Sequence, residues 1–155
     1  MAAYVELIKR KFNIRSWLLR HLISARMGRN DVAKIYSTVI RPALEYAAPV
    51  YGPLLNQASS DEIEKLQRRS MKMIFGHKTS YKDTLPTLEE RRKEIIKKFA
   101  LKLAANQKFD HWLPKHQPYN YKLRNVLRYE EEASHTDRLY RSPIFTFRRL
   151  LNNEL

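Results

Sequence analysis

Residues 32–47, VAKIYSTVIRPALEYA, decide the fold of this chain, because their apolar side chains keep a helical spacing straight through a proline. The apolar positions recur every three or four residues, as one amphipathic helix requires: Val32, Ile35, Tyr36, Val39, Ile40, Ala43 and Leu44. Pro42 lacks a backbone N–H and crowds the carbonyl four residues before it, so we expect the helix to kink there and to continue to about Ala47. Pro49 and Pro53 would then end it.

Two of the neighbouring segments begin with a capping-box pattern, in which a serine or threonine is followed three residues later by a glutamate. The pairs are Ser59 with Glu62 and Thr87 with Glu90, and a long amphipathic stretch follows each pair. A further helical stretch covers the N-terminal segment. The three glycines fall where helices are expected to end: Gly28, Gly52 and Gly76.

Together these segments predict an all-α protein, an irregular bundle of four main helices with a partly ordered C-terminal arm. Residues 1–108 form the expected basic helical bundle. Beyond them the periodicity decays, yet the stretch has too many aromatic residues for a disordered tail. We therefore expect residues 109–155 to form an aromatic-rich arm that packs on the bundle. Gln67 and Ser70 share the inward stripe of the third helix and would need buried hydrogen-bond partners.

The chain is strongly basic, with 30 Lys and Arg residues against 16 Asp and Glu residues, a net charge of +14 and a pI near 10.1. Residues 1–108 contain 22 of the basic and 10 of the acidic residues. An excess of this size implies a polyanionic partner, of which nucleic acid is the first candidate. The helical bundle would make the contact.

Little in the sequence supports catalysis or metal binding. The chain has no cysteine, which excludes disulfides and thiolate metal sites. Its aspartates stand singly and its histidines show no paired ligand spacing, so we expect no catalytic residue, no metal and no cofactor. The apolar runs are too short to cross a membrane, and the N-terminus does not resemble a signal peptide. We expect an intracellular protein of the nucleus or cytoplasm.

Two groups of cations have the spacing of a helix face that grips a phosphate backbone. The candidate residues are Lys65, Arg68, Arg69 and Lys72 on the third helix and Lys98 and Lys102 on the fourth. A merely solvated helix face is the alternative interpretation of this pattern. Arg91 and Arg92, beside the second group, would under another interpretation hold the fold by pairing with Glu45 or Glu62.

Several short motifs, taken in their order along the chain, resemble one protein family. The motifs are YSTVIRPALEYAAPVYGP (36–53), EKLQRRSMKMIFG (64–76), SYKDTLPTLEERR (80–92), KFALKL (98–103), LPKH (113–116) and LRYEEEASHTDRLYRSPIFTFRRLLN (127–152). Over nearly its whole length the chain resembles the region after the polymerase domain in reverse transcriptases of non-LTR retrotransposons, the LINE-type, jockey-like elements. The departures from the family pattern are mild: Tyr51 replaces the usual tryptophan and Ser70 the usual alanine.

The resemblance implies a helical thumb and C-terminal connector, which follow the palm domain that holds the catalytic aspartates. The aromatic-x-Asp-Asp turn of the palm is missing here, so the chain would not polymerise DNA by itself, although its parent protein would be an RNA-directed DNA polymerase. It would hold template RNA, a primer duplex or both by phosphate contacts. Arg41, Pro42, Glu45 and Tyr46 would have a structural role, with Arg41 and Glu45 tying the kinked helix to the third and fourth helices.

Two other interpretations stay open. The chain could be a protein-interaction module that docks on a host factor, or on the polymerase half that it lacks, through its aromatic arm. That interpretation predicts exposed side chains at Tyr140, Phe145 and Phe147. The chain could also be an open reading frame without a selected function.

Overall fold

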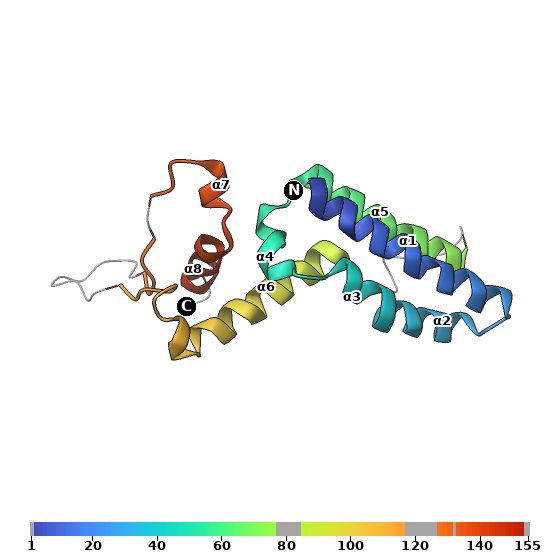
Figure 1. The fold of residues 1–155 in the computed structure, drawn as a ribbon. Coiled ribbons are helices and arrows are strands. Elements are labelled where there is room, and N and C mark those ends of the chain that lie inside the picture. The colour runs from blue at the N-terminus through green and yellow to red at the C-terminus, as the bar shows by residue number, and fades with distance from the viewer. Residues whose placement is uncertain (1, 77–84, 117–126, 132, 154–155) are drawn as a thin grey trace. The chain divides into compact units, whose positions relative to one another are not determined.

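The computed structural model describes residues 2–76, 85–116, 127–131 and 133–153, and this part of the chain is all-α (Figure 1). Its longest helices are α1 (Ala2–Ser24), α5 (Gln57–Phe75) and α6 (Leu88–Ala104). The shorter ones are α2 (Arg29–Ile35), α3 (Arg41–Leu44), α4 (Ala48–Tyr51), α7 (Asp137–Tyr140) and α8 (Pro143–Asn153). Extended pairing within the described residues is limited to an isolated bridge between Lys115 and Tyr129. The predicted fold class is confirmed.

The chain divides into two compact units. One comprises Met1–Ala47 and Leu55–Arg92, and the other comprises Ala48–Leu54 and Lys93–Leu155. The division therefore falls within α6, and not at residue 108 where the composition changes. The reason is that composition records where charges lie along the chain, whereas a compact unit is defined by which segments pack together.

The core of the first unit lies between α1, α5 and the segment from α2 to α3. Phe12 and Leu19 of α1 are fully buried with Tyr36, Ile40 and Ile63. Burying an aliphatic or phenyl side chain of this kind contributes roughly 1.5–3 kcal/mol. α1 and α5 lie side by side and run in the same direction (Figure 1). An ion pair between Lys9 Nζ and Glu62 Oε2, at 2.9 Å, joins the two helices.

The second predicted helix is divided in the structure. α2 passes into a π-helical segment, Tyr36–Ile40, and then into α3, which ends at Leu44 and not near Ala47. In the wider turn the Arg41 N–H bonds to the Tyr36 carbonyl, five residues back. Such a turn changes the hydrogen-bond register immediately before Pro42, the residue that cannot donate. The structure thus places a π-helical turn where the sequence predicted a kink.

The ends of the long helices depend on short-range side-chain and backbone bonds. Thr87 and Glu90 form the predicted capping box, because each backbone N–H donates to the other residue's side chain, at 3.0 and 3.2 Å. Ser59 was the wrong cap for α5, since Asn56 Oδ1 accepts from the Ser59 N–H at 2.9 Å and the helix starts at Gln57. Asn56, three residues before Ser59, therefore provides the cap that Ser59 was predicted to provide.

α1 ends before Gly28, in a turn whose left-handed residue is Arg26, with φ of 57°. Its bonds run from Met27 N to the Leu22 carbonyl at 3.1 Å and from Arg26 N to the Ile23 carbonyl at 3.0 Å. This is the Schellman pattern, in which glycine usually occupies the left-handed position. Gly28 has φ of −55° and directly precedes α2, so the prediction that it stops the first helix was wrong.

The second unit has a smaller core built on α6 and α8. Ile96, Ala100 and Leu103 of α6 pack with Phe147 and Leu151 of α8. Leu113 and Tyr129 complete this cluster. Phe147 is only 3% exposed, so the expectation of an exposed side chain there was wrong. Within the described residues, none of the helices combines the length and the apolar character needed to cross a membrane.

Candidate nucleic-acid interface

The burial pattern of α5 positions one group of predicted cations. Its inward stripe of seven side chains is buried: Ser60, Ile63, Glu64, Gln67, Ser70, Met71 and Ile74. Because these positions recur every three or four residues, the residues between them face outward. Lys65, Arg69 and Lys72 are accordingly exposed, and Arg68 is half-buried at the edge of the stripe.

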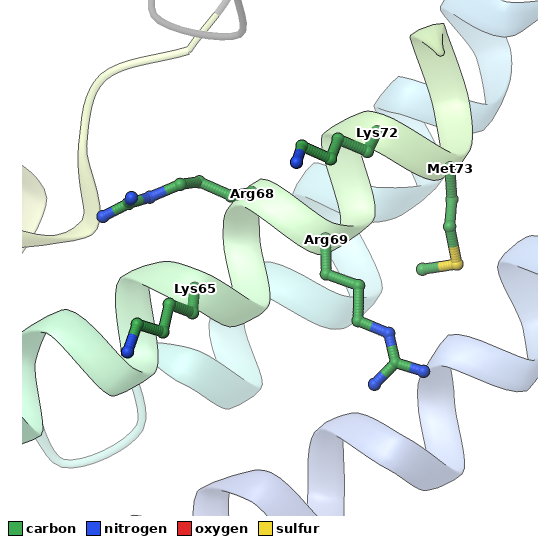
Figure 2. A pocket seen from close by; sticks show the side chains of 5 residues that line it. All are labelled: Lys65, Arg68, Arg69, Lys72 and Met73. Carbon is green, nitrogen blue, oxygen red and sulfur yellow. The ribbon is translucent and has the colours of Figure 1, made fainter. Parts of the chain in front are cut away.

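The four cations of α5 border one hollow of about 460 Å³, together with Met73 (Figure 2). We call this hollow the basic groove and define it by Lys65, Arg68, Arg69, Lys72 and Met73. Figure 2 shows Arg69 and Met73 pointing toward the neighbouring blue helix, α1, whereas Lys65, Arg68 and Lys72 extend to the other side. The charges are therefore spread along the helix and do not gather at one point.

The charge of the basic groove is not neutralised by the described part of the chain. No carboxylate among those residues forms an ion pair with Lys65, Arg68, Arg69 or Lys72. Glu62, one turn before Lys65, forms its ion pair with Lys9: the hydrogen bond and the charge of Lys9, with a smaller effect from the charge of Lys65, hold the pKa of Glu62 below its usual value. Lys65, Arg69 and Lys72 are therefore exposed and have no ion-paired carboxylate within the described ranges.

One donor in the basic groove has no partner. Arg68 Nε is buried, and no hydrogen bond to it is found in the described structure. A buried donor left without a bond costs about 1–3 kcal/mol, so an acceptor at Arg68 Nε would be stabilising, and the described residues do not provide one. Arg68 is therefore the residue of the groove that most directly indicates a bound ligand.

The second group of predicted cations belongs to the other unit. Lys98 and Lys102 lie on α6 beyond Arg92, and both are exposed. They are one helical turn apart and so present two charges on the same face of α6. Lys98 and Lys102 belong to the second unit, whereas the residues of the basic groove belong to the first.

Arg91 and Arg92 are engaged with the fold. Arg91 donates to both carboxylate oxygens of Glu45, from Nε at 3.2 Å and from Nη2 at 3.4 Å. Arg92 is buried and donates from Nη2 to the Ser60 hydroxyl, and its burial lowers its pKa. Of the two partners considered from the sequence, Glu45 is the one that pairs, because Glu62 is bonded to Lys9.

Of the four motif residues, Arg41 and Glu45 share the ion-pair cluster of Arg91. Arg41 is 6% exposed and donates from Nη2 to the Pro86 carbonyl at 2.7 Å, while its Nε lies 3.2 Å from Glu45 Oε1. Pro42 is exposed. The Tyr46 carbonyl accepts from the Tyr4 hydroxyl, and the Tyr46 ring lies under Lys11 Nζ at 4.1 Å. Tyr46 therefore contacts α1.

Three groups in this cluster were not assigned a role from the sequence. The Pro86 carbonyl accepts from Arg41 and also from Gln67 Nε2 at 3.1 Å. Tyr36 donates to Gln67 Oε1 at 3.1 Å, and buried Glu64 accepts from the Leu88 N–H at 3.0 Å. The signal for Glu64 was its place one turn before Gln67 on the inward stripe. No pattern in the sequence indicated that the Pro86 carbonyl would accept two hydrogen bonds.

No catalytic or metal-binding arrangement is visible in the described ranges. Within them, no three His, Asp or Glu side chains are placed to hold a metal ion. Comparisons with protein-family models, with curated proteins and with solved structures found no match to this chain. The case for a function therefore rests on the residues and their geometry.

Proposed function

We propose that this chain is a non-catalytic nucleic-acid-binding segment, the thumb and connector of a reverse transcriptase from a non-LTR retrotransposon. It would hold template RNA or an RNA–DNA primer duplex by phosphate contacts, in the nucleus or cytoplasm. The observation that carries the proposal is the basic groove, in which four cations without an ion-paired carboxylate in the described structure lie along one helix and Arg68 Nε has no described acceptor.

The dimensions of the groove suit a strand of several phosphates. Lys65 and Lys72 are seven residues apart on α5. At a rise of about 1.5 Å per residue they are separated by about 10 Å along the helix axis. One strand of a duplex advances by roughly three nucleotides over that distance, at about 3.4 Å each. Contacts of this kind recognise the backbone and its shape, and not the base sequence.

The reverse-transcriptase part of the proposal is supported by the ordered motifs, from the IRPALEY segment (40–46) to RSPI (141–144). Two of the family-matching residues, Glu45 and Arg91, bond directly to each other. The polymerase palm would then be a protein partner, and the catalytic aspartates would be supplied by it.

The experiment measures binding of the full chain to an RNA–DNA hybrid over a series of salt concentrations. The triple variant Arg68→Ala, Arg69→Ala, Lys72→Ala should bind more weakly and about equally so for unrelated sequences. The slope of log K against log salt should become shallower by about 2–3, since each lost phosphate contact removes roughly 0.9 from it.

The matched control is Arg10→Ala, Lys108→Ala, Arg138→Ala, which removes the same charge from three exposed positions outside the groove. This control should keep most of the wild-type slope. If the two triple variants have equal slopes, the groove is not the binding site and the net charge alone explains binding.

A second candidate function, docking on a host factor or on the polymerase half, is favoured by an exposed apolar face of α1. Leu7, Ile14 and Trp17 are 43, 68 and 58% exposed. Such exposure on one helix is typical of a protein contact. The variant Ile14→Ala, Trp17→Ala should then lose affinity for a separately expressed polymerase half and keep its affinity for the hybrid. Loss of hybrid binding would instead assign this face to nucleic acid.

A further inference from the structure

A second hollow, of about 310 Å³, lies where α1 ends, α2 begins and α5 ends. We call it the end pocket. The described residues that line it are Ile23, Arg26, Met27, Arg29, Val32, Met73, Ile74 and Gly76. Pockets that hold small ligands begin at about 300 Å³, so the space suits one compact group and not a long one.

The end pocket is lined by apolar side chains and by two positively charged ones. Ile23, Met27 and Met73 supply the accessible apolar surface, and Val32 and Ile74 are buried beneath it. Arg26 and Arg29 supply two guanidinium groups, and the described lining has no acidic residue. A ligand that fits this chemistry has an apolar face and an adjacent negative charge.

Arg29 is held by a bond to the end of α5, and Arg26 has a strained backbone conformation. Arg29 Nη1 donates to the Phe75 carbonyl at the end of α5, at 3.0 Å. Arg26 occupies the left-handed position of the Schellman turn, where a side chain is strained and glycine would be favoured. Strained residues of this kind are common at binding sites, where the direction of a side chain matters more than local stability.

The end pocket adjoins the basic groove, because Met73 lines both hollows. A strand that follows the groove toward the C-terminal end of α5 therefore reaches the pocket. We propose that the end pocket takes an unpaired nucleobase from the end of the strand whose phosphates lie in the basic groove. This inference rests on the proposed function and names the part of the nucleic acid that the site would select.

A nucleobase matches the pocket better than a phosphate alone. Its flat faces are apolar and pack on methionine and isoleucine side chains, and guanidinium planes stack on bases. Its neighbouring phosphate supplies the charge that Arg26 and Arg29 require. Because every base has such a face, the pocket would select an unpaired end without reading its sequence.

The test compares three probes with the full chain: a blunt RNA–DNA hybrid, the same hybrid with a short unpaired extension, and that extension built from abasic nucleotides. The abasic probe keeps the phosphates and lacks the bases. We expect the unpaired extension to raise the affinity at least about fivefold over the blunt hybrid, the lower limit for stacking of one base. The abasic extension should lose this gain.

Two variants assign the gain to the pocket. Met27→Ala removes an exposed apolar side chain from the lining of the end pocket. Arg26→Gly removes a guanidinium group, and glycine readily adopts the left-handed backbone conformation of this position. Both should bind the blunt hybrid as the wild type does and should lose the gain from the extension. The triple groove variant should instead weaken binding of all three probes.

Equal binding of the base-containing and abasic extensions would overturn the inference and leave the proposed function standing. The inference would also be overturned if Met27→Ala kept the full gain in affinity from the unpaired extension. An apolar side chain of a partner protein would then be the occupant of the end pocket to test. Absence of wild-type binding to the blunt hybrid would remove the proposed function and, with it, this inference.

Discussion

Arg91 and Glu45 form a forked ion pair, in which Nε donates to Oε1 at 3.2 Å and Nη2 donates to Oε2 at 3.4 Å. Glu45 follows α3, and Arg91 lies in the first turns of α6, so the pair joins segments 46 residues apart. The Glu45 side chain is 10% exposed, and its Oε1 also lies 3.2 Å from Arg41 Nε. One carboxylate thus neutralises two guanidinium groups.

Replacing Glu45 by glutamine should lower the free energy of unfolding by about 3 kcal/mol, because the buried Arg41 then loses its only described carboxylate. Urea unfolding measures the change. The matched control Asp110→Asn neutralises an exposed carboxylate that has no side-chain bond among the described residues, and it should change stability little. A double-mutant cycle with Arg91→Gln should show coupling between the two positions. Additive effects would mean that the pair does not hold the fold.

The variant Arg41→Met should unfold more easily by about 2 kcal/mol, since the Pro86 carbonyl loses a charged donor at 2.7 Å. Its folded form should bind RNA as tightly as the wild type, because Arg41 is 6% exposed. Thermal unfolding and RNA titration below the melting temperature check the two parts. Unchanged stability with abolished RNA affinity would show that Arg41 contacts RNA.

The variant Tyr36→Phe should cost about 1 kcal/mol near neutral pH, because Gln67 Oε1 loses the hydroxyl that donates to it at 3.1 Å. Burial raises the pKa of Tyr36 above its ordinary value of 10.0. The folded wild type therefore keeps this proton while the unfolded chain releases it, and stability falls as the pH rises above 10.0. Tyr36→Phe lacks this loss, so the difference between the two proteins should shrink at alkaline pH. A constant difference would contradict burial of the hydroxyl.

The variant Arg26→Gly should raise the free energy of unfolding by about 0.5–1 kcal/mol, because glycine adopts a positive φ without strain. Ala47→Gly, at φ of 53°, should act in the same direction. Gly28→Ala is the contrasting control: its φ of −55° suits any residue, and a Cβ there would meet Asp31 Oδ2 at 3.2 Å, so this change should not gain stability. Destabilisation by Arg26→Gly would show that the arginine side chain contributes more than the backbone strain costs.

Features that depend on neighbouring residues were predicted well. The Thr87–Glu90 capping box is confirmed on both of its bonds. The need of Gln67 and Ser70 for buried partners is confirmed, since Gln67 bonds to Tyr36 and to the Pro86 carbonyl and Ser70 bonds to the Leu66 carbonyl. The cap at the start of α5 was predicted wrongly, since Ser59 was expected there and Asn56 provides it.

The sequence by itself determined that the chain is helical and that α5 carries four cations beside an apolar stripe, because helical periodicity and capping act within one or two turns. Only the tertiary structure decided that Phe147 is buried, that Glu45 meets Arg91 and that Ile23 and Met73 line one pocket. These features join residues far apart in the chain, and their free energy comes from packing and desolvation, which no local pattern of residue types specifies.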